Sequence, residues 1–139
     1  MSELELLLAG ELEPGVYSWA SQAPLADVRR KVESAAWRFV HLDTTGVDDK
    51  TGFLDEAAAA FGFPGWFGRN WDAFADSLGD VRAERGTLVL WDGSGHFAAG
   101  NEEQFAVALE ILRDRSESTL GGAFGVLVRG EPGMLADDA

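Results

Sequence analysis

The sequence contains no cysteine, which excludes disulfides, zinc sites built on thiolates and thiol-based catalysis. It is also poor in basic residues, with 11 Lys and Arg against 24 Asp and Glu, for a formal net charge of −13. Such a surface repels the phosphates of nucleic acids and anionic membranes, so neither is an expected partner. It favours a positively charged partner, although a high net charge also serves simply to keep a protein soluble.

Long apolar runs are missing as well. No stretch reaches the roughly 18 apolar residues that a membrane-spanning helix needs. Residues 1–9 lack the basic start and the long apolar segment of a signal peptide, so the expected location is the cytoplasm. With 139 residues and 46% hydrophobic content, the chain is expected to form a single domain, 1–139, with a substantial core.

The sequence has few patterns that support catalysis. It has no Gly-x-Ser-x-Gly elbow, no phosphate-binding glycine loop with a lysine, and no His-x-x-x-His pair. Asp92, Ser94 and His96 are such near neighbours that we predict a turn there rather than a triad. His41 has no second ligand near it in sequence, which indicates a structural role. We therefore expect no enzyme activity, no cofactor and no metal.

Apolar periodicity and turn residues predict an α/β fold. Residues 4–9 and 15–19 resemble two short strands that could form an edge hairpin. The main elements are predicted as helices over residues 24–36, 51–61, about 68–79 and 101–115, and strands over residues 37–43, 87–91 and 122–128.

Two local signals refine this prediction. Residues 87–91 form a continuous apolar run, which is typical of a parallel strand covered by helices. Asn101 and Gln104 fit a capping box at the start of the last helix. We therefore expect a small parallel three-stranded sheet with packed helices, preceded by an extension made of the hairpin and the first helix.

The segment 61–81 has the most distinctive pattern. On a helix, Asp72, Asp76 and Asp80 stack at i, i+4 and i+8, opposite an apolar stripe. The stripe consists of Phe67, Trp71, Phe74, Leu78 and Val81. The aspartates repel one another, and the helical projection places only Arg69 near them. A cationic partner is the simplest reason for such a row.

Other interpretations of the aspartates remain open. They could form a merely solvated face, act as acid–base groups, or bind Mg²⁺ or Ca²⁺. A row on the open face of a helix is neither buried nor convergent, however, which disfavours catalysis and metal binding.

Residues 63–78, Phe-Pro-Gly-Trp-Phe-Gly-Arg-Asn-Trp-Asp-Ala-Phe-Ala-Asp-Ser-Leu, resemble the signature of the barstar family of intracellular inhibitors of secreted ribonucleases. The matching positions are Pro64, Trp66, Phe67, Gly68, Asn70, Asp72, Ala73, Asp76 and Leu78. The likeness is expected to cover residues 37–129. Residues 1–36 would then be an extension that adds a strand and helix to the sheet or forms a second contact surface, and residues 130–139 a frayed tail.

The resemblance implies a helix and loop that block a ribonuclease active site, with carboxylates where RNA phosphates would sit. Asp76 would be the central anion and Asp72 its companion. Trp66 would be the aromatic plug, and Gly68 and Asn70 would shape the loop. The implied partner is a secreted basic ribonuclease or nuclease toxin, bound by a monomer in a 1:1 complex.

Three further positions follow from the same comparison. An ungapped alignment through residues 109–113 places the family's additional acidic contact at Asp114. Ala75 belongs to the implied surface but stands where the family's prototype has a large aromatic residue. Trp71 is larger than the aliphatic residue expected, so it either strengthens the core or reaches the partner. Alternative functions are an acidic adaptor or nucleic-acid mimic for another cationic protein, and a small enzyme that uses Asp72 and Asp76.

Overall fold

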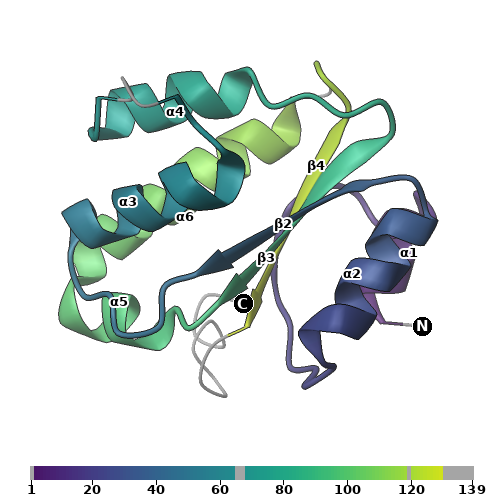
Figure 1. The fold of residues 1–139 in the computed structure, drawn as a ribbon, viewed down its shortest axis with the longest axis horizontal. Helices are drawn as coiled ribbons and strands as arrows, with labels where there is room; N and C mark the ends of the chain where they lie inside the picture. Colours follow the sequence, from purple (N-terminus) through teal and green to yellow (C-terminus); the bar gives the residue numbers. More distant parts are fainter. Residues whose placement is uncertain (1, 65–67, 119, 130–139) are drawn as a thin grey trace.

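The computed structural model describes residues 2–64, 68–118 and 120–129 (Figure 1). In chain order, the elements are α1 (Glu3–Leu8), β1 (Val16–Ser18), α2 (Leu25–Ser34), β2 (Arg38–Asp43), α3 (Lys50–Phe61), α4 (Trp71–Gly79), β3 (Gly86–Asp92), α5 (Gly95–Gly100), α6 (Glu102–Glu117) and β4 (Ala123–Arg129).

The strands form one parallel sheet in the order β1-β4-β3-β2. The register aligns Val40, Val89, Val126 and Val16 in a row across all four strands. The predicted α/β class and parallel pairing are confirmed. The sheet has four strands rather than three, because β1 from the N-terminal extension pairs with β4.

Helices cover both faces of the sheet (Figure 1). On one face, Val40, Val89 and Trp91 pack in a large core with the apolar sides of α3, α4, α5 and α6. On the other face, Leu90 and Leu127 pack beneath α1 and α2. Because successive side chains of a strand point to opposite faces, the continuous apolar run of β3 supplies both cores.

The N-terminal segment differs from its prediction. Residues 4–9 were expected as one strand of a hairpin, but Glu3–Leu8 is the helix α1. The alternation of Leu and Glu at the start of the chain is compatible with a strand. Leu4 and Leu7 are also three residues apart, which places them on one face of a helix, and both are buried against the sheet. Ser2 caps the helix by accepting a hydrogen bond from the Glu5 amide. No hairpin forms, because β1 pairs in parallel with β4.

The segment after β3 also differs. Residues 92–96 were predicted as a turn, but the chain enters the short helix α5 at Gly95. Asn101 precedes α6 without forming a side-chain cap, so the expected capping box with Gln104 is absent. The end of α3 follows its prediction, since Gly62 adopts the left-handed conformation with φ of 72°.

Within the described residues, none of the helices is both long and apolar enough to cross a membrane.

Leu7→Ala tests whether the extension is part of the main fold. Leu7 is 1% exposed, and its side chain packs where Gly125 leaves room on β4. We expect the variant to lose about 2–5 kcal/mol of unfolding free energy in urea, through a single transition. Leu120→Ala is the control, because Leu120 is 76% exposed. Equal stability of the two variants would show that α1 contributes nothing to the core.

Candidate partner-binding site

The helix α4 begins at Trp71, three residues after the expected start at Gly68, because Asn70 caps it. The Asn70 side-chain oxygen accepts a hydrogen bond from the Ala73 amide at 2.8 Å. Its side-chain nitrogen donates to the Gly68 carbonyl at 2.9 Å. One side chain therefore fixes both the first turn of α4 and the chain that leads into it.

The inner face of α4 attaches it to α6 and α3. Phe74 and Leu78 are fully buried, and Trp71 is half-buried against the rings of Phe53 and Phe74. The Trp71 indole nitrogen donates to the Gln104 side-chain oxygen on α6 at 2.6 Å. Trp71 therefore strengthens the core, and Gln104 binds α4 instead of capping its own helix.

Arg115 of α6 holds the other end of α4, a role that the sequence analysis missed. Its guanidinium donates to the carbonyls of Leu78 and Val81, each at 2.9 Å, and lies 4.7 Å from the centre of the Phe124 ring. Burial first, and the nearby charge of Arg82 second, lower the pKa of Arg115. The buried guanidinium links α6 to the last turn of α4 and to Val81 just beyond it, and its positive charge opposes the negative end of the helix dipole.

The outer face of α4 carries the acidic row, defined as Asp72, Asp76 and Asp80. All three side chains are exposed. Among the described residues, none forms an ion pair with any of them. Asp72 lies in the first turn, where a negative charge stabilises a helix, but Asp80 is the C-cap, where a negative charge does not. The row therefore costs helix stability toward its C-terminal end.

Arg69 does not neutralise this row as the helical projection suggested. Its guanidinium forms an ion pair with Asp55 on α3. Arg69 also has a positive φ of 38°, in the loop that precedes Asn70. This pairing leaves Asp72 without the basic residue nearest to it in the sequence.

Three of the other predicted site residues, Gly68, Ala75 and Asp114, lie within the described part of the chain. Gly68 is exposed in the loop before α4, and Ala75 is exposed on α4 itself. Asp114 is exposed on α6, which packs directly against α4. Trp66, the expected plug, and Phe67 of the apolar stripe lie outside the described residues, as does the tail 130–139.

A second polar cluster lies at the carboxyl ends of the strands. Asp92 on β3 accepts hydrogen bonds from Arg129 on β4 at 2.7 and 3.0 Å, and is 2.8 Å from the Nε2 atom of His41 on β2. Burial raises the pKa of Asp92, but the hydrogen bonds from Arg129 and His41 outweigh it, so the pKa lies below its ordinary value. The hydrogen bond to Asp92 holds the half-buried ring of His41 in place.

This cluster does not form the triad considered from the sequence. Asp92 is bound to His41 and Arg129, while His96 is exposed on α5. Ser94 is buried, and its hydroxyl forms no hydrogen bond within the described part of the chain. Nor do three or more potential metal ligands from His, Asp or Glu gather anywhere in that part.

Comparison with known families identifies the architecture that holds the acidic row. Residues 37–129 match the family model described as barstar, the barnase inhibitor. This match covers more than half of the chain. The chain belongs to the barstar family.

The match to barstar covers the same residues, 37–129, over which the resemblance was expected. It contains α4, α6 and the strands β2, β3 and β4, whereas α1, β1 and α2 precede it. A search of curated proteins found no match to this chain.

Arg115→Met tests whether α6 fixes the end of α4. Methionine removes the donors to the Leu78 and Val81 carbonyls while it keeps much of the side-chain volume. We expect a loss of about 3 kcal/mol in unfolding free energy and faster amide exchange at the end of α4. The exposed Arg113, changed to Met, is the matched control on the same helix. An Arg115→Met variant as stable as this control would contradict the anchoring role.

Proposed function

We propose that this protein inhibits a basic ribonuclease by placing Asp72 and Asp76 in the active site of the enzyme. The observation that carries the proposal is the exposed acidic row, which lacks a described counter-charge on a helix fixed at both ends. Membership of a family named for a nuclease inhibitor supports the same function.

The chemistry of the two surfaces is complementary. A ribonuclease binds phosphates with Arg, Lys and His side chains, and these cations form short charge-assisted hydrogen bonds with carboxylates. Asp72 and Asp76 are one helical turn apart, with their Cβ atoms about 5–6 Å from each other, so neighbouring cations could each receive one carboxylate. Desolvation at the centre of an interface strengthens such pairs, which makes Asp76 the expected hot spot.

A rigid helix increases the affinity of this arrangement. The cap by Asn70, the hydrogen bond from Trp71 to Gln104 and the hydrogen bonds from Arg115 are already present without a partner. The backbone of α4 is therefore already ordered before a partner binds, so little conformational entropy would be lost on binding.

Residues around the acidic row complete the proposed contact. Gly68 and Asn70 would offer the loop backbone, with Trp66 as the aromatic plug and Asp114 as an additional anion from α6. Ala75 is exposed beside Asp76. Its small side chain leaves room for a bulky partner residue where the family's prototype carries an aromatic ring.

The proposed partner is a secreted basic ribonuclease or nuclease toxin, bound 1:1 in the cytoplasm by the monomeric inhibitor. The protein itself performs no reaction in this proposal. The acidic row occupies the active site, and inhibition follows from exclusion of RNA.

Asp76→Ala tests the proposal in inhibition titrations against barnase and several other small secreted ribonucleases. We expect an inhibitory wild-type protein and a variant whose binding is weaker by at least about 2 kcal/mol, or roughly 30-fold. Because Asp76 is exposed, the unfolding free energy should change by less than about 0.5 kcal/mol.

Glu33→Ala is the matched control, because it removes an exposed carboxylate from α2 on the other face of the sheet. This control should inhibit like the wild type. Equal inhibition by Asp76→Ala and the wild type would refute the role of Asp76. Failure of the wild type to inhibit any basic ribonuclease tested, with salt-sensitive capture of another cationic protein, would favour the acidic adaptor.

A further inference from the structure

The outer edge of β2 is an unpaired strand. β2 is the last strand in the sheet order and pairs with β3 on one side only. Among the described residues, no backbone hydrogen bond reaches Arg38–Asp43 from the side away from β3. An edge strand of six residues presents unpaired N–H and C=O groups that can pair with another extended chain.

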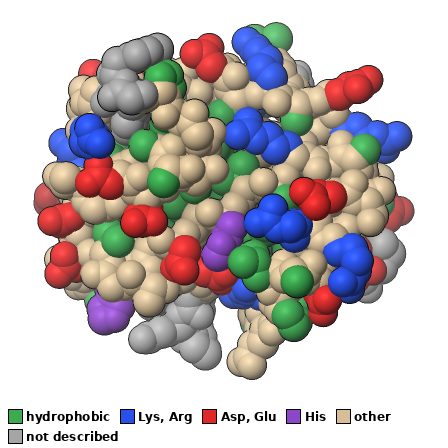
Figure 2. Space-filling model, in the orientation of Figure 1, with side chains coloured by type: hydrophobic (Ala, Val, Ile, Leu, Met, Phe, Trp, Pro, Cys, Tyr) green, Lys and Arg blue, Asp and Glu red, His purple; other side chains and the backbone are tan. Residues whose placement is uncertain are grey.

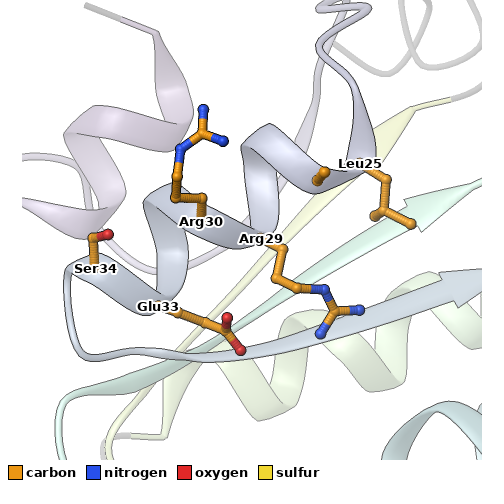
Figure 3. Close-up of a pocket in the computed structure, with 6 residues that line it drawn as sticks. Leu25, Arg29, Arg30, Glu33 and Ser34 are labelled. Atoms are coloured by element: carbon orange, nitrogen blue, oxygen red, sulfur yellow. The ribbon is translucent and has the colours of Figure 1, made fainter.

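Two arginines flank this edge, one on each face of the strand. Arg38 is exposed on β2 itself and donates to the carbonyl of Phe61 at the end of α3. Arg29 extends from α2, with its guanidinium 5.0 Å from the centre of the Phe39 ring on β2 (Figure 3). Neither arginine forms an ion pair with a carboxylate of the described residues.

These cations are unusual in a chain with more than twice as many acidic as basic residues. Figure 2 shows several Lys and Arg side chains over the part of the surface where α2 and β2 lie in Figure 1. A shallow groove follows α2 there, lined by Leu25, Ala26, Arg29, Arg30, Glu33 and Ser34 (Figure 3). Arg30 pairs with Asp27 and Glu33 also lines the groove, so Arg29 is the lining cation that has no ion-pair partner among the described residues.

The side chains of β2 also suit an added strand. Phe39 and His41 are half-buried on the α2 side, with their rings nearly parallel and 6.4 Å apart. Asp92 holds the His41 ring through its hydrogen bond. Alternate side chains of an added strand would lie beside these two rings. The rings could therefore make binding depend on the sequence of the added strand, while backbone pairing would not.

We propose that the edge of β2, with Arg29 and Arg38, binds an extended acidic segment of a second protein partner by strand addition. Backbone pairing requires an extended chain, and the two unpaired arginines require carboxylates on it. A second copy of this chain is a poorer occupant, because a two-fold pairing of two β2 edges would bring the same arginines of both copies together.

This surface is independent of the proposed nuclease site. The acidic row lies on α4, in the helix layer on the opposite face of the sheet from α2 (Figure 1). Arg29 precedes the residues that match barstar, so the groove belongs to the extension. The inhibitor could therefore hold a nuclease and an acidic partner at the same time.

The test uses a blocked peptide of about eight residues in which Glu alternates with Val, titrated into the ¹⁵N-labelled full chain. We expect chemical-shift changes concentrated at residues 38–43 and at Arg29. Arg29→Glu should weaken binding roughly tenfold or more, because it replaces attraction by repulsion. Arg113→Glu, the same charge change on exposed α6, should bind like the wild type.

Two modified peptides separate strand addition from simple charge attraction. A peptide with Lys in place of Glu should not bind, and one with alternate backbone amides N-methylated should lose binding because it cannot pair with the edge. Equal binding of the methylated peptide, or no shift changes at residues 38–43 at millimolar peptide, would overturn the proposal. So would a dimer through β2 in sedimentation of the protein alone.

Two variants, assayed for both inhibition and peptide binding, distinguish this proposal from the nuclease proposal. Arg29→Glu should leave ribonuclease inhibition unchanged, while Asp76→Ala should leave peptide binding unchanged. Loss of both activities in Arg29→Glu would show that the two surfaces are one, and would overturn the independent site.

Discussion

The two faces of α4 make opposite demands on the helix. Its inner face must bury Phe74 and Leu78, while its outer face holds three carboxylates that repel one another without a described counter-charge. Tertiary contacts offset the repulsion, because Gln104 and Arg115 of α6 bind the two ends of the helix. The negative surface can therefore stay ordered and exposed, and in the proposed function a cationic partner would pair with it at a small entropic cost.

The N-terminal extension changes the sheet rather than standing apart from it. β1 adds a strand beside β4, and α1 with α2 covers the face that the helices of the barstar match leave open. Arg129 joins the two parts, since it donates to the Ala23 carbonyl of the extension at 2.7 Å and binds Asp92 of β3. The extension places Arg29, Arg30 and Lys31 of α2 on the far side of the sheet from α4.

The continuous apolar run over residues 87–91 predicted the parallel sheet, and helical periodicity predicted α2, α3 and the exposed aspartates. Two predictions from weaker patterns were wrong. The alternation of Leu and Glu suggested a strand where the structure has α1, and the glycines around α5 suggested a turn where it has a short helix. Arg115 lies at helical spacing on the apolar face of α6, so the same periodicity could have predicted that this residue is buried. The partners of Gln104 and Arg69 could not be predicted, because both depend on how separate helices pack.

The most direct test of the central claim is the association rate with a nuclease that the protein inhibits, measured by stopped-flow fluorescence at increasing salt. The Debye length falls from about 30 Å at 0.01 M to about 8 Å at 0.15 M ionic strength. If the uncompensated carboxylates of α4 guide binding, the rate constant should fall roughly tenfold or more over this range, and much less for a variant with all three aspartates changed to Asn. A rate constant that does not change with salt would contradict the account.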